Sequence, residues 1–288
     1  MSRESPGPTI RRRMLGRELR RLREAVALTC DDVGKRLQWS GAKVSRIETA
    51  RTAAHANDVR LLLDLYSLKS DEHREMLIDL TRMPRRSQGW WTDFPDVVPG
   101  KRWSFVKLED DAEMIRNYEV EFIPGLLQTE AYARSCFKAA CPTATSEAID
   151  RQVAARMARQ QLMGRDDAPE LWLVLNDAAL RRTAAMQAST ARSQFEHLLA
   201  AAAKPNVTFQ VLPFAVEPHP GQNGSFTLIQ FPDPGGEVVH LDTLTGSLYL
   251  EEPQQLKSYD LAFQHLKAEA LNEADSLKHV RDLIHQET

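Results

Sequence analysis

A segment of eight residues, Gly41–Glu48, carries the side chains best suited to recognising a large polar partner. Lys43, Ser45 and Arg46 all offer hydrogen-bond donors within four positions. Lysine and arginine donate to guanine edges or to phosphate oxygens, and serine can do either. Glycine and alanine at the start of the segment would let its backbone approach such a partner closely. The residue types therefore indicate a surface that contacts nucleic acid.

Two short helical patterns would position these donors. Thr29 is placed to cap the first helix, and Asp32 three residues later makes a weaker form of the capping box. Ser40 is placed to cap the second helix, which would turn Val44 and Ile47 inward and the donors outward. A helix, a turn and a second helix in this order form a helix-turn-helix, whose second helix enters the DNA major groove by its N-terminal end.

The predicted DNA contacts come from this recognition helix and from its basic surroundings. Arg51, directly after the helix, and Arg60 are equally consistent with a phosphate contact and with a solvated side chain. For the arginines at positions 11, 12, 13, 17 and 20, contact with phosphates and a general increase of the local potential are both open. The predicted DNA-binding residues are Ser40, Gly41, Ala42, Lys43, Ser45, Arg46, Arg51, Cys30 and Arg17.

The string WSGAKVSRIETAR at residues 39–51 resembles the signature of lambda-repressor-like, or XRE-type, helix-turn-helix regulators. The resemblance implies that Glu48 fixes the scaffold. It also implies a phosphate contact at the position of Cys30, where the family generally has glutamine. Ala50 stands where the family generally has glycine, which suggests a different end for the recognition helix because alanine is a poorer left-handed cap.

The rest of the chain is similar to a C-terminal domain found in WhiJ-like, antitoxin-like regulators of actinobacteria. That resemblance implies a small partner protein encoded nearby, which this domain would bind. The blocks that carry the resemblance are GWW (89–91), VKLEDDAEMIRNYE (106–119), PGLLQTEAYAR (124–134), ARQQLM (158–163), NVTFQVLPF (206–214), GSFTLIQFPDP (224–234) and LYLEEP (248–253).

Charge is distributed unevenly along the 288 residues. Residues 1–86 carry 19 Lys and Arg against 12 Asp and Glu, whereas the remainder carries 18 against 28. A basic head on an acidic body fits a head that binds a polyanion. The chain has no apolar run of the roughly 18 residues that a bilayer requires and no secretory signal. We therefore expect a cytoplasmic protein that is associated with the nucleoid when it binds DNA.

The sequence contains few of the motifs that indicate an enzyme. The glycine-rich run at residues 221–225 lacks the ending of a phosphate-binding loop, and neither a nucleophile elbow nor a zinc-binding helix is present. The eight histidines are scattered, and three cysteines are an odd number for a disulfide framework. We expect no catalytic residues, no cofactor and no metal.

The hydrophobic pattern predicts an α+β chain with three parts. Residues 1–83 form an all-α head of five helices, residues 84–104 form a tryptophan-rich joint, and residues 105–288 form a mixed regulatory and dimerisation domain. That domain should hold about four to five strands, including 171–175, 207–212, 226–231 and 238–241. A helix is expected from Phe105 through Ile115, followed by an extended segment at Val120–Ile123.

Three functions remain open from these patterns. The leading one is a homodimeric, sequence-specific transcription regulator, which would act as a repressor or as an activator. The others are an antitoxin-like module that binds a small protein, and a repressor whose aromatic pocket binds a small-molecule effector. The aromatic residues that would form either that pocket or a core are Trp90, Trp91, Trp103, Tyr118, Phe122, Tyr132 and Trp172.

Overall fold

The computed structural model divides the chain into two compact units, a head within Met1–Ser87 and a body formed by Gln88–Gln230 and Glu237–Thr288. Parts of the predicted joint, residues 84–88 and 98–101, and the side chain of Trp103 lie outside the description. No helix in the described part of the chain is both long and apolar enough to cross a membrane. The structure describes residues 10–81, 89–97, 102–216, 218–232, 236–243 and 246–286.

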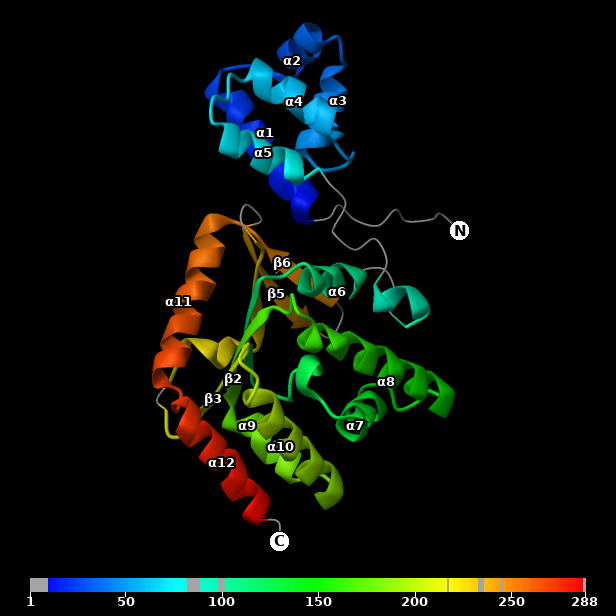
Figure 1. The fold of residues 1–288 in the computed structure, drawn as a ribbon, viewed down its shortest axis with the longest axis vertical. Coiled ribbons are helices and arrows are strands. Elements are labelled where there is room, and N and C mark those ends of the chain that lie inside the picture. The colour runs from blue at the N-terminus through cyan, green and yellow to red at the C-terminus, as the bar shows by residue number, and fades with distance from the viewer. Residues whose placement is uncertain are drawn as a thin grey trace. The chain divides into compact units, whose positions relative to one another are not determined.

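Five helices form the head, as predicted (Figure 1). All five supply apolar side chains to a single core, in which Leu19, Val33, Val44 and Leu63 are completely buried. Burial of one face of each helix supplies most of the stability that such short helices lack on their own. The helices are α1 (Ile10–Ala25), α2 (Cys30–Leu37), α3 (Gly41–Glu48), α4 (Ala56–Leu65) and α5 (Asp71–Asp79).

Each of the first four helices of the head is followed, within two residues of its end, by a left-handed residue that is not glycine. These residues are Ala27, Gln38, Ala50 and Ser67, with φ between 54° and 57°. The prediction that alanine at position 50 changes the helix end is therefore wrong, because Ala50 keeps the left-handed conformation. A left-handed backbone costs roughly 1–2 kcal/mol for a residue with a Cβ atom, and glycine avoids this cost.

Replacement of Ala27 by glycine is expected to stabilise the head by about 0.5–1 kcal/mol. Ala27 is exposed, so loss of its methyl group removes no core packing. Ala25 is also exposed but belongs to α1, so Ala25→Gly should destabilise the head by a similar amount. Hydrogen exchange of the head amides in the full chain measures both effects. Equal signs for the two substitutions would contradict this explanation.

The body is built on one mixed sheet of six strands in the order β3-β2-β1-β4-β5-β6. Strands β1, β2 and β3 are parallel, and β4, β5 and β6 continue the sheet from β1 in antiparallel pairs. The strands are β1 (Met114–Glu119), β2 (Glu170–Asn176), β3 (Val207–Leu212), β4 (Phe226–Gln230), β5 (Glu237–Thr243) and β6 (Gly246–Leu250).

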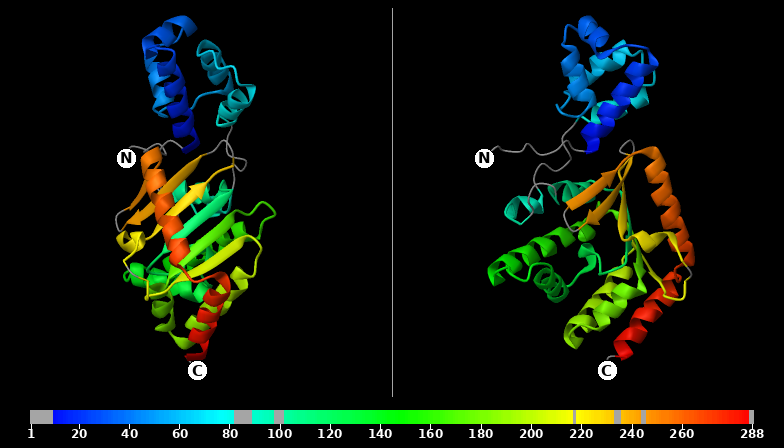
Figure 2. Two further views of the ribbon diagram at one scale, coloured as in Figure 1. Left: turned by 90° about the vertical axis from the view of Figure 1, so that its left-hand side faces the viewer. Right: turned by 180° about the vertical axis from the view of Figure 1, so that it is seen from behind.

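Helices cover both faces of this sheet (Figure 2). The connections between the parallel strands place α7 to α10 on one face, and α11 packs on the other through Phe263 and Leu266. The helices of the body are α6 (Arg102–Asp110), α7 (Glu130–Ala140), α8 (Ser146–Gln160), α9 (Asp177–Ala184), α10 (Ala188–Ala202), α11 (Pro253–Glu269) and α12 (Glu273–Gln286).

The α+β class is confirmed, but two elements of the body differ from the prediction. Helix α6 ends at Asp110, and Ile115 belongs to β1 instead of the predicted helix. The expected extended segment Val120–Ile123 lies after β1 and is not a strand. Residues of β1 have backbone partners on both β2 and β4, and this pairing outweighs the local helical spacing. Strand β6 was not predicted.

Candidate nucleic-acid interface

Caps at both helix starts position the helix-turn-helix. The hydroxyl of Thr29 accepts from the backbone N–H of Asp32 at 3.1 Å, and the Asp32 carboxylate accepts from the N–H of Thr29 at 3.0 Å. The hydroxyl of Ser40 accepts from the N–H of Lys43 at 3.1 Å. Both predicted caps are therefore present, and each satisfies backbone donors that a helix start would leave free.

The turn between α2 and α3 depends on a glycine. A Cβ atom on Gly34 would lie 2.9 Å from the backbone nitrogen of Gly41 and 2.9 Å from the carbonyl oxygen of Trp39. Both neighbours are backbone atoms, which cannot move aside without moving α3. Gly34 thus allows the two helices to meet this closely.

A second glycine fixes the other end of α3. A Cβ atom on Gly16 of α1 would lie 2.4 Å from the carbonyl oxygen of Glu48 and 2.8 Å from that of Ile47. Helix α1 therefore packs directly on the last turn of the recognition helix. The sequence analysis did not single out this glycine, because its partner is 32 positions away.

The outer face of α3 presents polar groups. Ala42, Ser45 and Arg46 are exposed, whereas Val44 and Ile47 are buried in the core of the head. The guanidinium of Arg46 has neither a hydrogen bond nor an ion pair within the described part of the chain. This side chain is available to donate to an external acceptor.

Lys43 is held differently. Its Nζ lies 3.1 Å from Oδ1 of Asp58, in the first turn of α4, and 3.6 Å from the centroid of the Trp39 ring. The two side chains are 33% and 19% exposed, so this partly buried ion pair remains within reach of a phosphate or a guanine that could replace Asp58 as the partner of Lys43. Asp58 was missed by the sequence analysis, since no local signal connects it with Lys43.

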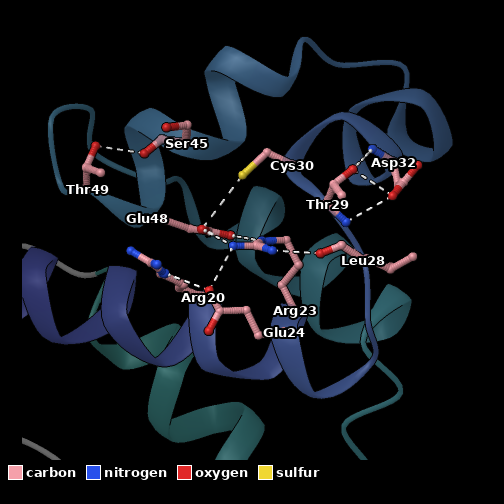
Figure 3. A network of polar contacts seen from close by, with 10 residues as sticks. All are labelled: Arg20, Arg23, Glu24, Leu28, Thr29, Cys30, Asp32, Ser45, Glu48 and Thr49. Carbon is pink, nitrogen blue, oxygen red and sulfur yellow. Dashed lines mark hydrogen bonds and ion pairs between the residues drawn. The ribbon is translucent and has the colours of Figure 1, made fainter.

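Behind α3 lies a buried ion pair (Figure 3). Arg23 of α1 donates from Nε and Nη2 to the Glu48 carboxylate at 2.7 and 2.9 Å, and from Nη1 to the carbonyl of Leu28 at 2.6 Å. The Arg23 and Glu48 side chains are only 10% and 4% exposed. The scaffold role implied for Glu48 agrees with this geometry, which ties the end of α3 to α1.

Cys30 faces this pair instead of solvent. Its Sγ lies 3.9 Å from Oε2 of Glu48, and burial together with the Glu48 charge raises the pKa of the thiol (Figure 3). Burial likewise raises the pKa of the nearby Tyr66 hydroxyl. The thiol of Cys30 therefore belongs to the inner side of α2, and a DNA contact at this position would fall to its backbone.

The remaining predicted contacts flank the recognition helix. Arg17 is exposed on α1, and Arg51 is exposed just after α3. Arg20 pairs with Glu24 on the same helix at 2.8 Å. The side chain of Arg11 lies outside the described residues. The structure thus brings Gly41, Ala42, Lys43, Ser45 and Arg46 together on α3 with Ser40 as its N-cap, and it places Arg17 and Arg51 on other segments.

Comparison with known proteins agrees with this division of the chain. A family model described as a helix-turn-helix domain matches residues 14–77. A second model, described as a domain of unknown function (DUF5753), matches residues 103–282. Neither a curated protein nor a solved structure matches the chain. The head is therefore the helix-turn-helix of a DNA-binding regulator. The second model matches more than half of the chain, so the protein belongs to the DUF5753 family.

Proposed function

We propose that the protein is a sequence-specific transcription regulator that inserts α3 into the major groove of duplex DNA. The observation that carries this proposal is the outer face of α3, where Ser45 and Arg46 are exposed and Arg46 has no partner in the described chain. The buried pair of Arg23 and Glu48 fixes the direction of this helix. A protein that recognises base edges must hold a few hydrogen-bond donors rigidly in position.

We further propose that the protein binds DNA as a homodimer. A helix of eight residues reads only a few base pairs, and two such helices about 34 Å apart would read the halves of a pseudo-palindrome. The body is the proposed dimerisation and signal-receiving part, without enzymatic activity. Leu261 on α11 is half exposed there and available for contact with a second copy. The signal is either a small partner protein or a small molecule.

Selection from a pool of random duplexes tests the proposed function. The full chain should enrich a motif with two half-sites about 10 base pairs apart, and its affinity should fall steeply with salt. Light scattering of the bound complex should give two chains per duplex. Recovery of unenriched sequences, with equal affinity for every duplex, would overturn sequence-specific binding. Enrichment of a single half-site by one chain would overturn the dimer only.

A further inference from the structure

One face of the body's sheet carries polar side chains in adjacent cross-strand positions. Asn117 of β1 lies opposite Thr227 of β4, and Thr227 lies opposite His240 of β5. The amide nitrogen of Asn117 donates to the Thr227 hydroxyl at 2.9 Å. A sheet face covered by helices is normally apolar. The opposite face under α11 also holds polar side chains, but these are paired, Arg116 with Glu237 and Asp260, and Gln210 with Trp172. The polar row therefore calls for a functional explanation.

This row forms the floor of a cavity of about 230 Å³ beneath α6 and α8. About 10–15 Å³ of such space is enough for one water molecule, so the cavity is large enough for a small organic molecule. Phe105, Phe122 and Phe137 line its walls together with Trp90. Aromatic walls around a few fixed polar groups are the usual composition of a small-molecule site.

Six of the seven aromatic residues considered in the sequence analysis have described side chains, and these six lie in three different settings. Trp90 and Phe122 line the cavity, whereas Trp91, Tyr118 and Tyr132 are buried in the core. The ring of Trp172 is covered by Lys267, whose Nζ lies 4.0 Å from the ring centroid. Both interpretations of the aromatic group thus apply, each to different members.

Two buried atoms at this cavity lack a hydrogen-bond partner among the described residues: Oε2 of Glu119 and Nε2 of His240. The Glu119 carboxylate does accept hydrogen bonds from Ser225 and Asn117, and Nε2 of His240 lies 4.0 Å from Oδ1 of Asp242. His240 is only 5% exposed and packs its ring on Phe105 with centroids 4.0 Å apart. Buried polar atoms are almost always paired in folded proteins. Both residues line the cavity, so a bound molecule can supply the missing partners.

The charge states of the cavity favour a cationic ligand. Burial lowers the pKa of His240 to about 4, so its imidazole is neutral near pH 7 and adds no positive charge to the cavity. Burial raises the pKa of Glu119 to about 7, and the charge of Asp242 adds to this rise. A cation next to Glu119 would favour the ionised carboxylate and would repay its burial.

The cationic side chains at the cavity already have partners. Arg159 donates from Nε and Nη2 to the buried Glu109 carboxylate, at 2.6 Å in each case. Arg156 donates to Oε1 of Gln128 at 2.6 Å, and its guanidinium lies 4.4 Å from the centroid of the Phe137 ring. The carboxylate of Glu119 has no arginine or lysine partner in the described residues, and neither has that of Asp242, which also lines the cavity.

We propose that this cavity binds a small organic cation, namely a protonated amine or amidine carried on an aromatic or cyclic body. The cationic group donates to Glu119, and the body lies against the rings of Phe105 and Phe122. This inference goes beyond the proposed DNA-binding function and does not depend on it. It assigns a ligand class to the domain of unknown function.

Tryptamine is the probe for the first test, because it joins an aromatic ring to a protonated amine. Tryptophol has the same skeleton with a hydroxyl in place of the amine, and indole-3-acetate carries a negative charge. Calorimetry and ligand-observed NMR on the full chain should show saturable binding of tryptamine, at least tenfold tighter than that of tryptophol. Indole-3-acetate should bind more weakly still.

Amino-acid substitutions test whether tryptamine binds in this cavity. Glu119→Gln should weaken tryptamine binding at least tenfold, whereas Glu113→Gln, which changes an exposed carboxylate outside the cavity, should have no effect. Phe122 is 51% exposed and Phe214 is 65% exposed, so alanine at either position should leave the fold intact. Phe122→Ala should weaken binding severalfold, and Phe214→Ala, away from the cavity, should not.

Tryptamine affinity measured as a function of pH gives a result that loss of folding would not produce. Between pH 6 and pH 8 the ionised fraction of Glu119 rises, and tryptamine affinity should rise by up to about tenfold with it. The other charged groups that face the cavity are Asp242 from β5, Glu109 from α6, and Arg156 and Arg159 from α8. In Glu119→Gln the pH dependence should disappear.

Three results would overturn the proposal. One is the absence of saturable binding of tryptamine at millimolar concentration. Another is equal affinity for tryptamine and indole-3-acetate. The third is unchanged tryptamine affinity in a folded Glu119→Gln variant. Because none of these measurements uses DNA, each can fail while sequence-specific DNA binding by the head is confirmed, and the reverse holds as well.

Discussion

Replacement of both Lys43 and Arg46 by alanine is expected to abolish the preference of the protein for its selected DNA sequence while the head stays folded. Each of these side chains can discriminate a base by about 1–3 kcal/mol through hydrogen bonds in the major groove. Loss of both should therefore reduce the affinity ratio of selected to scrambled duplex by roughly 30-fold or more. Arg46 is exposed and Lys43 makes one partly buried ion pair, so the cost in stability should be small against the roughly 5–15 kcal/mol that typically stabilises a domain.

A matched variant separates base recognition from simple loss of positive charge. Arg21→Ala with Lys69→Ala removes two exposed charges from the head but leaves α3 intact. It should weaken binding to both duplexes alike and leave their ratio unchanged. Fluorescence anisotropy at one salt concentration measures the affinities of the wild type and of both variants for the two duplexes. A fall of the ratio in this control equal to that of the α3 variant would contradict the assignment.

Asp58→Asn should act in the opposite direction. Removal of this carboxylate frees Lys43 from its 3.1 Å ion pair and removes a negative charge close to the expected phosphates. Affinity for DNA should increase severalfold because the ion pair no longer competes. If affinity falls, Asp58 itself takes part in orienting Lys43 toward DNA.

Arg23→Met is expected to unfold the head. The substitution leaves the Glu48 carboxylate buried without its partner and deprives the Leu28 carbonyl of a donor. Breaking a buried ion pair in this way costs about 3–5 kcal/mol, which is a large part of the 5–15 kcal/mol that typically stabilises a domain. Hydrogen exchange of the full chain should show rapid exchange in α1 to α5 and native protection in the body.

The double variant Arg23→Met with Glu48→Met distinguishes a buried charge from a general packing defect. It removes both charges and fills the space with flexible apolar side chains. Most of the lost protection should return, because a buried pair replaced by hydrophobic residues is often close to neutral in stability. A double variant less stable than Arg23→Met would show that packing is the cause.

Local signals were sufficient to predict much of the head. Thr29 and Ser40 act within three residues of their partners, and Val44 and Ile47 follow helical spacing. In each of these cases the interacting residues are close in the sequence, so a short stretch of sequence is enough to predict the interaction. The same is true of the α+β order of the body, where strands and helices alternate with their own periods.

Long-range pairs decided the rest. Asp58 is 15 positions from Lys43 and Arg23 is 25 positions from Glu48, so no window of helical length contains either pair. Glu119 and His240 approach one cavity only after β1, β4 and β5 have paired in register. Strand β1 was assigned partly to a helix for the same reason, because its partners lie far along the chain.

The left-handed alanines at the ends of α1 and α3 also bear on how this head can evolve. Every alanine codon becomes a glycine codon by one change at its second base, so relief of the backbone cost at Ala27 or Ala50 is a single mutation away. Such readily improved residues are expected to persist when selection removes only variants whose stability falls below the level that function needs. A glycine at the exposed position 27 would then supply extra stability that compensates for a destabilising change on the DNA-reading surface of α3. New DNA specificities would thus be accessible to this head without loss of its fold.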